Sequence, residues 1–217
     1  MKRTVGWVVV ALFAVALLDG CVVPVIGAAA VGTGVVATDR RSVGIQLEDS
    51  KIESRVNSAL IDTIPKGAMN ADVTSYNRKV LLAGEVKTAE QRALAEQVAA
   101  KVENVRQVVN ELTVGDLATL GDRTDDTILS GKVKATLLEA DGVPTGVVKT
   151  TVNRGVVYLL GKVTPAEGEA AAKAASRVSG VRRVVKLFDL ITDQDVEQIK
   201  KNQASESANS PKSEPPK

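Results

Sequence analysis

The chain has no histidine, a single cysteine and only 2% aromatic residues among its 217 positions. A histidine acid–base pair and an ordinary zinc site are therefore excluded. The formal net charge of +2 is too small to give the broad basic surface of a nucleic-acid-binding protein. We expect a protein that is not an enzyme, has no catalytic residues, holds no metal or other cofactor, and binds no nucleic acid.

The densest acidic group consists of Asp122, Asp125 and Asp126. These residues precede a predicted helix, and the helix dipole favours carboxylates at that end. The glycine and the terminal glutamate of an EF-hand loop are missing at the required spacings. We interpret the group as helix capping in preference to a calcium site.

The only cysteine ends a segment that is typical of a secretion signal. Two basic residues precede an uncharged apolar stretch at residues 5–18, and a glycine stands directly before Cys21. This order predicts a lipoprotein signal peptide over residues 1–20, with Cys21 as the lipidated first residue of the mature protein. Asp19 departs from the small or apolar residue usual at its position. The alternative is an uncleaved signal anchor with a buried cysteine.

Residues 21–45 are predicted to carry the lipidated cysteine and a flexible tether. The run 22–36 is apolar and rich in glycine and alanine, but its 15 residues are fewer than the roughly 20 that a helix needs to cross a bilayer. It is either a tether that lies against the membrane or a simple linker. Val22 stands where inner-membrane lipoproteins usually carry aspartate, and this resembles the sorting pattern of outer-membrane lipoproteins. Residues 196–217 end in a Ser-, Pro- and Lys-rich run and are predicted to be a disordered tail.

The rest of the chain carries one pattern twice. Val80, Gly84 and Val86 recur 77 positions later as the residues Val157, Gly161 and Val163. A constant offset across separate elements indicates two copies of a small domain. We place the first domain at residues 46–115, a linker at 116–125 and the second domain at 126–195. Each copy is expected to fold as a separable unit, unless close packing between the copies makes them one cooperative block.

Each copy follows the order α-β-β-α-β, which is an α+β fold with a three-stranded sheet packed by two helices. In the first copy, apolar residues recur at helical spacing from Ile52, and alternating runs at 70–75 and 79–86 predict a hairpin. Thr88 opens the second helix with a capping box, and a third strand follows at 105–114. The second copy repeats this order, with Asp126 or Thr127 as the cap of its first helix, Thr164 and Pro165 at the start of its second helix, and strands at 147–152, 156–163 and 181–191.

The two L-x-G-x-V strand ends at 82–86 and 159–163, with the closing valine-rich runs at 102–109 and 178–185, resemble the BON domain. The run at 38–44 is similar to a signature of dual BON-domain outer-membrane lipoproteins. The resemblance covers residues 38–192. It implies a lipid-anchored outer-membrane protein that faces the periplasm, binds anionic phospholipid through its second domain and supports envelope integrity.

The two copies differ most on the first helix of the second copy. Apolar residues lie there beside a glycine and two lysines, away from the predicted core stripe, and this pattern is typical of a helix lying in a membrane interface. The resemblance implies that this helix binds a phosphatidylglycerol-like lipid, and the candidate residues are Ile128, Gly131, Lys132, Lys134, Ala135 and Leu138. Ile128 stands where relatives can carry an aromatic residue. The alternative is that Ile128 and Leu138 pack against the first domain.

Tyr76 lies in the first predicted hairpin, and the resemblance implies that it helps to dock the two copies or a partner. The second functional hypothesis is a periplasmic adaptor or chaperone-like protein that binds outer-membrane assembly machinery, with lipid contact incidental.

Overall fold

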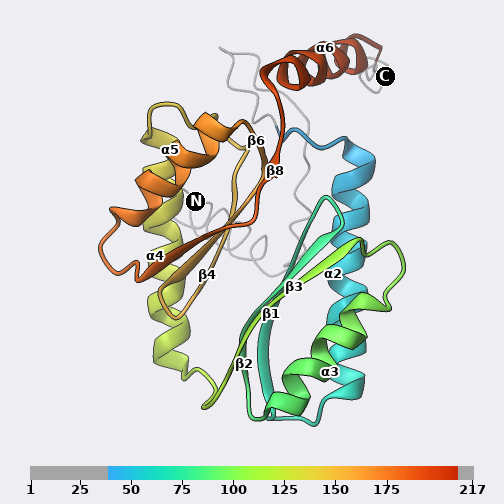
Figure 1. Cartoon of the computed structure of the whole chain (residues 1–217), viewed down its shortest axis with the longest axis vertical. Coiled ribbons are helices and arrows are strands. Elements are labelled where there is room, and N and C mark those ends of the chain that lie inside the picture. The colour runs from blue at the N-terminus through green and yellow to red at the C-terminus, as the bar shows by residue number, and fades with distance from the viewer. Residues whose placement is uncertain (1–38, 210–217) are drawn as a thin grey trace, which may run out of the picture. The chain divides into compact units, whose positions relative to one another are not determined.

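The computed structural model describes residues 39–209 (Figure 1). The chain divides after Val35, and every element below belongs to the unit from Val36 to Lys217. The predicted signal peptide, Cys21 and most of the predicted tether lie outside the described residues. Between residues 39 and 209, no helix has both the length and the apolar character needed to cross a membrane.

The first domain has the predicted order of elements. They are α2 (Val43–Thr63), β1 (Met69–Tyr76), β2 (Lys79–Val86), α3 (Ala89–Ala100) and β3 (Gln107–Val114). Strand β2 lies in the middle of the sheet, antiparallel to β1 and parallel to β3. Figure 1 shows both helices on one side of this sheet.

The second domain repeats this arrangement with two interrupted strands. Its elements are α4 (Leu120–Glu139), β4 (Lys149–Asn153), β5 (Val156–Leu160), β6 (Lys162–Val163), α5 (Pro165–Ser176), β7 (Arg183–Lys186) and β8 (Asp189–Leu190). Strand β5 pairs with β4 and β7, and beyond Gly161 the short β6 and β8 pair with each other as a separate two-stranded sheet. The α+β class and the repeated α-β-β-α-β order are confirmed.

Local sequence signals set the starts of three helices. Thr88 and Thr164 cap α3 and α5 through complete capping boxes, with Gln91 and Glu167 as the partners three residues on. The predicted cap of α4 at Asp126 or Thr127 is wrong, because a capping box of Thr119 and Asp122 starts the helix at least seven residues earlier. Helix α4 therefore occupies part of the predicted linker.

Asp126 instead holds the hairpin turn of its own domain. Its carboxylate accepts hydrogen bonds from the backbone N–H groups of Arg154 (2.7 Å) and Gly155 (3.0 Å). Asp49 does the same in the first domain, accepting from the N–H groups of Asn77 and Arg78 at 2.7 Å each. All four turn residues have positive φ, as a two-residue type I′ turn requires. Each hairpin is thus tied to the first helix of its domain.

The central strands bury both of their faces. Val80 and Leu82 of β2 pack under α2 and α3, whereas Leu81 and Ala83 point the other way into a cluster with Tyr158 and Leu160 of β5. A strand covered on both sides reads as a continuous apolar run instead of an alternating one. The two domains are therefore joined through the sheet faces that their helices leave uncovered.

The glycines of the L-x-G-x-V strand ends allow a close approach of the edge strand. A Cβ atom at Gly84 would lie 2.0 Å from the carbonyl oxygen of Asn70, and one at Gly161 would lie 2.7 Å from that of Val147. Any side chain at either position would force the edge strand away from its neighbour.

The interface between the domains is built around equivalent residues. The hydroxyls of Thr74 and Thr151, which are 77 positions apart, share a hydrogen bond of 2.9 Å. A contact between the same position of two copies is what a two-fold interface produces. Tyr76 is buried in this interface, where its hydroxyl accepts a hydrogen bond from the backbone N–H of Lys162 at 3.1 Å. Burial raises the pKa of Tyr76 to about 12.

Charged side chains in the interface are paired. Glu85, 1% exposed, accepts the backbone N–H of Ala118 at 3.0 Å and forms an ion pair of 2.9 Å with Arg154 of the second domain. Lys79 pairs with Asp189 at 3.0 Å. Without Arg154, the buried carboxylate of Glu85 would lose its counter-ion, which is strongly destabilising. We therefore expect one cooperative block, which the sequence left open, and not two separable domains.

Residues 39–45 were predicted to be tether, but they form ordered contacts and the first turn of α2. The guanidinium of Arg40 donates two hydrogen bonds to the carboxylate of Glu167, at 2.6 and 2.8 Å, and one to the carbonyl of Lys162. Arg41 lies 4.1 Å above the ring of Tyr76 and pairs with Asp49. The segment that leads into the first domain is thus bound to the second.

The predicted disorder from residue 196 is wrong up to residue 209, where helix α6 (Asp193–Asn209) ends. Thr192 and Asp195 exchange hydrogen bonds at the start of α6, and Val196 is buried. The side-chain amide of Gln203 donates to the carbonyl of Asp39 at 2.8 Å. These contacts stabilise a segment whose composition alone is typical of disorder.

Leu160→Ala tests the cooperative interface. The side chain of Leu160 is fully buried between the sheets, so the change should lower the free energy of unfolding by about 2–5 kcal/mol. In urea, the chain from Val36 should unfold in one transition. The unfolding curve measured by circular dichroism should coincide with the curve measured by the fluorescence of Tyr76 and Tyr158, which both lie in the interface. Leu190→Ala, at an exposed position, is the control and should change little. Two separate transitions in the unmutated chain would contradict this view.

Glu167→Gln tests the contact between the N-terminal segment and the second domain. The hydrogen bonds from Arg40 lower the pKa of Glu167, so the carboxylate stabilises the fold above the unfolded pKa of about 4.3. That contribution is lost as the pH falls through the lowered pKa of the folded state. Glutamine keeps the capping oxygen, as Gln91 shows in α3. The variant should therefore be less stable than the unmutated chain at pH 7, with the difference shrinking below about pH 4.

The matched control is Glu169→Gln, on the same helix, where the carboxylate pairs with Lys186 in an exposed position. It should have little effect on stability at any pH. Chemical denaturation at a series of pH values measures both variants. A stability difference for Glu167→Gln that did not depend on pH would show that the ion pair is not its cause.

Candidate functional site

Helix α4 carries an apolar stripe on the side opposite its core residues. Its core side chains are Leu129, Val133 and Leu137. Ile128 is 53% exposed and Leu138 is 61% exposed, so they do not pack against the first domain in the way the alternative interpretation required. The predicted residues Gly131 and Ala135 are also exposed and lie between them at helical spacing.

The stripe extends further than the sequence indicated. Leu120, in the first turn of α4, is 82% exposed and falls on the same line as Ile128 and Leu138. Sequence reasoning missed it because the helix was expected to start at residue 126. At 1.5 Å per residue, the line from Leu120 to Leu138 is about 27 Å long. We call this line the α4 stripe; its members are Leu120, Thr124, Ile128, Gly131, Ala135 and Leu138.

Two lysines flank the α4 stripe. Lys132 and Lys134 are exposed and lie on opposite sides of the line at 100° per residue. Within residues 39–209, neither ammonium group forms a hydrogen bond or an ion pair. Both remain available for an anion outside the protein.

Gly131 has no role in the packing of the domain. A Cβ atom at this position would meet nothing within 4 Å. A glycine within a helix costs roughly 0.5–1 kcal/mol relative to alanine. The fold therefore gives no reason for glycine in the middle of the α4 stripe.

The same helix of the first domain carries only the ends of such a stripe. Val43, Leu47 and Ile61 are exposed apolar residues on α2, at positions equivalent to Leu120, Thr124 and Leu138. The centre of the line is polar, with Lys51, Ser54 and Ser58 in place of Ile128, Gly131 and Ala135. An apolar line that is unbroken from Ile128 to Leu138 is therefore a property of the second domain.

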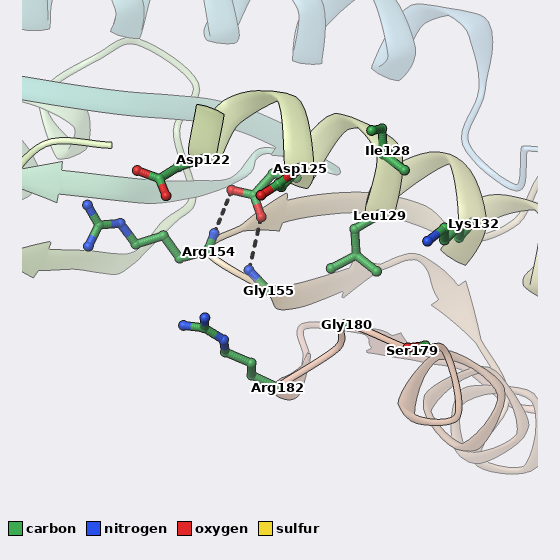
Figure 2. Close-up of a pocket in the computed structure, with 11 residues that line it drawn as sticks. Asp122, Asp125, Ile128, Leu129, Lys132, Arg154, Gly155, Ser179, Gly180 and Arg182 are labelled. Carbon is green, nitrogen blue, oxygen red and sulfur yellow. Dashed lines mark hydrogen bonds between the residues drawn. The ribbon is translucent and has the colours of Figure 1, made fainter. Parts of the chain in front are cut away.

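A pocket of about 440 Å³ lies beside the first half of α4. Figure 2 shows that three segments surround it: α4, the turn between β4 and β5, and the loop between α5 and β7. The side chains that reach it include Asp125 and Lys132 from α4 and Arg182 from the loop. The pocket therefore adjoins the face of α4 that carries Ile128.

The three acidic residues of this region have different roles. Asp122 belongs to the capping box, and hydrogen bonds from the backbone and side chain of Thr119 lower its pKa. Asp126 holds the hairpin turn, while Asp125 has no hydrogen bond or ion pair in the described part of the chain. The capping interpretation is thus right for Asp122 and wrong for Asp126. No group of three metal-ligating side chains occurs within residues 39–209.

Comparison with known proteins identifies the family. The profile of the BON domain matches residues 48–116 and 125–192. Outer membrane lipoprotein DolP of Haemophilus influenzae is 38% identical over 178 residues, covering 82% of this chain and 92% of that protein. The chain belongs to the dual BON-domain outer-membrane lipoproteins. The resemblance seen in the strand ends and closing runs is therefore confirmed.

Two further relatives of this dual BON-domain lipoprotein have different names. The 21 kDa hemolysin of Actinobacillus pleuropneumoniae is 34% identical, covering 70% of this chain and 79% of that protein. Osmotically-inducible protein Y of Escherichia coli K12 is 33% identical, with coverage of 69% and 76%. The relatives of this chain are thus named for different properties.

Proposed function

We propose that this lipoprotein is anchored in the outer membrane through Cys21, faces the periplasm and binds anionic phospholipid through the α4 stripe. In this role it supports the integrity of the outer membrane. The observation that carries the proposal is an exposed apolar line from Ile128 to Leu138 on a helix whose opposite side forms the core, with a free lysine on each side.

The physical character of the α4 stripe suits a helix that lies in the membrane interface. Ile128 and Leu138 can enter the acyl boundary. Moving one such side chain completely out of water is favourable by about 1.5–3 kcal/mol. Lys132 and Lys134 would meet phosphates, at about 1 kcal/mol for each cation near an anionic surface. Contact of this strength is reversible by itself.

The lipid anchor would raise the local concentration of the domains at the membrane. A linked second contact becomes intramolecular, so a weak surface can be occupied without strong affinity of its own. Gly131 fits this role because the absence of a side chain lets the headgroup region approach the helix backbone. The α4 stripe would then set which lipids the anchored protein contacts.

The second candidate function is an adaptor that binds outer-membrane assembly machinery. Val43 and Leu47 on α2 favour it, being 76% and 56% exposed. Scattered exposed apolar residues need no explanation, but paired ones on a helix can form part of a protein contact. Lipid binding that is absent, together with a partner captured through α2, would support this function.

Cys21→Ala tests the anchor. A single acyl chain holds a protein only marginally, whereas the several chains of a lipidated N-terminal cysteine hold it stably. The variant should lose the acyl mass at its N-terminus and leave the outer-membrane fraction, as mass spectrometry and fractionation would show. Lys51→Glu, remote from the signal in sequence, should fractionate normally. Absence of acyl mass from the unmutated mature protein would contradict the proposal.

Ile128→Glu tests the α4 stripe in the chain from Val36, which contains every core and interface contact described above. The charge at the acyl boundary should weaken binding to phosphatidylglycerol vesicles by about tenfold or more. Because Ile128 is half exposed, the thermal midpoint should stay close to that of the unmutated chain. Vesicle co-sedimentation and thermal unfolding measure the two effects.

Lys134→Glu should weaken binding less and flatten its dependence on salt, since only the electrostatic part is lost. Lys51→Glu is the matched control, because Lys51 occupies the position of Ile128 in the first domain. It should change little. If Ile128→Glu left binding intact, or if the unmutated chain bound phosphatidylcholine equally well, the α4 stripe would not be a site for anionic lipid.

A further inference from the structure

The last strand of the second domain leaves its outer edge open. The order β4-β5-β7 places β7 at the edge of its sheet. The backbone N–H groups of Leu187 and Asp189 donate inward, to carbonyls within residues 159–161, at 2.8 Å each. Backbone groups alternate in direction along a strand, so those of Lys186 and Phe188 face outward. An edge with outward N–H and C=O groups is a template for pairing with another chain.

The first domain closes the same edge with side chains. The guanidinium of Arg92 on α3 donates to the backbone carbonyl of Asn110 at 3.1 Å. The side-chain oxygen of Asn110 accepts the backbone N–H of Leu112 at 3.2 Å, and its amide donates to the carboxylate of Glu96 at 3.1 Å. Outward groups of β3 are thus bonded to side chains of α3 and of the strand itself, and an edge covered in this way is protected from pairing.

The second domain carries none of these bonds. The residues 76 positions later are Gly168, Ala172, Lys186 and Phe188. Within residues 39–209, the carbonyl of Lys186 accepts no side-chain hydrogen bond and the N–H of Phe188 donates none, while the carbonyl of Phe188 is met by Lys79 at 3.5 Å. Gly168 is explained by packing, because a Cβ there would lie 3.1 Å from the ring of Phe188. The arrangement that packs this ring therefore leaves outward backbone groups of the strand without cover.

A groove of about 540 Å³ lies between α5 and β7 and borders this strand. Ala172 of α5, with Val181 and Val184 of the segment that forms β7, lines it with apolar groups. Lys173 of α5 is exposed, and among residues 39–209 its ammonium group forms no hydrogen bond or ion pair. Successive side chains of a strand point to opposite faces, so alternate side chains of a strand added beside β7 would face this groove.

The groove carries more positive charge than the same place in the first domain. Its lining includes three cations and one carboxylate, whereas the equivalent residues 76 positions earlier include one of each. The differences are Glu169 for Ala93, Ala172 for Glu96, Lys173 for Gln97 and Arg183 for Gln107. The ion pairs of Arg183 with Glu111 and of Lys186 with Glu169 have exposed cations, so each contributes little. Acidic side chains of a partner can therefore compete for these cations.

Charge and composition disfavour two other occupants of the edge. A second copy that paired antiparallel through the centre of β7 would place Arg183 opposite Lys186, and like charges directly opposite destabilise a pair of strands. Residues 22–38 of the chain carry no charge, and residues 210–217 hold three prolines, which cannot donate to a ladder. A separate chain with acidic residues fits the edge better than either.

We propose that the outer edge of β7 binds an extended acidic peptide segment of another protein as an added strand. The backbone of the segment pairs with the outward groups of Val184, Lys186 and Phe188. Its apolar side chains cover the floor of the groove, and its carboxylates meet Lys173. Main-chain pairing supplies affinity in this mode of recognition, and the side chains of the groove supply selection. The proposal goes beyond lipid binding and does not depend on the α4 stripe.

Amide hydrogen exchange tests the pairing directly. The probe is a peptide of about ten residues in which glutamate and valine alternate, added in excess to the chain from Val36. The outward amides of Lys186 and Phe188 should exchange at least about tenfold more slowly with the peptide than without it. The inward amide of Leu187 already has a partner and should change little. The control is the same peptide with lysine for glutamate, which should protect neither amide. Protection by both peptides, or by neither, would overturn the proposal.

Lys186→Pro tests the edge with little change to the fold. The N–H that proline lacks faces outward, so no bond to β5 is lost, and edge strands tolerate proline at such positions. Binding of the acidic peptide, measured by calorimetry, should weaken at least about tenfold. Lys186→Ala is the matched control, because it removes the same ammonium group and keeps the N–H, and it should weaken binding about twofold. Equal binding by the two variants would show that no strand is added.

Lys173→Glu is a second variant, in case the proline disturbs the fold. Lys173 is exposed on α5, so the reversed charge should leave the fold intact and weaken binding of the acidic peptide about fivefold. Gln97→Glu makes the same change at the equivalent position of the first domain and should leave binding unchanged. If Lys173→Glu bound the acidic peptide as tightly as the unmutated chain does, the groove would not select for acidic segments.

Two further measurements separate this proposal from the other possibilities. Ile128→Glu should bind the peptide like the unmutated chain, and a loss of binding would move the peptide to the α4 stripe and overturn the proposal. Sedimentation of the unmutated chain should show a monomer. A dimer that Lys186→Pro dissociated would show that the edge of β7 joins two copies instead of binding a separate acidic segment.

Discussion

The packing of the two sheets against each other determines how the rest of the molecule can be used. Helices cover one face of each sheet. The other face of each sheet is buried against the sheet of the other copy, through Leu81, Ala83, Tyr158 and Leu160. Neither sheet keeps a free face. Any surface for a ligand must therefore be found on the outer sides of the helices, at the loops or at the sheet edges, which is where the α4 stripe, the pocket and the edge of β7 lie.

The duplicated fold also separates what the architecture needs from what is specific to one copy. Asp49 and Asp126 hold their hairpin turns in the same way, and Gly84 and Gly161 both admit a close edge strand. These positions are the same because each copy must build the same sheet. Ile128, Gly131 and Ala135 differ from Lys51, Ser54 and Ser58, although both sets lie on the first helix of their domain. A change that the fold does not require is a good indicator of function.

The interface and the pocket share structural elements. Asp126 fixes the turn that carries Arg154 and Gly155; Arg154 pairs with Glu85 of the first domain, while Gly155 lines the pocket. Through Arg154, the first domain thus contacts the turn that lines the pocket.

The sequence alone determined features that depend on near neighbours in the chain. The repeat, the order of elements and the capping boxes at Thr88 and Thr164 follow from spacing that any local window contains. The start of α4 at Leu120 had a local signal as well, in Thr119 and Asp122, but the stronger acidic group further on obscured it. Only the tertiary structure showed that β2 is covered on both faces, because a continuous apolar run does not say what covers it. It alone showed that α6 is held to Asp39, and that residues of α4 and of the loop between α5 and β7 line one pocket, since residues far apart in the sequence meet only when the chain has folded.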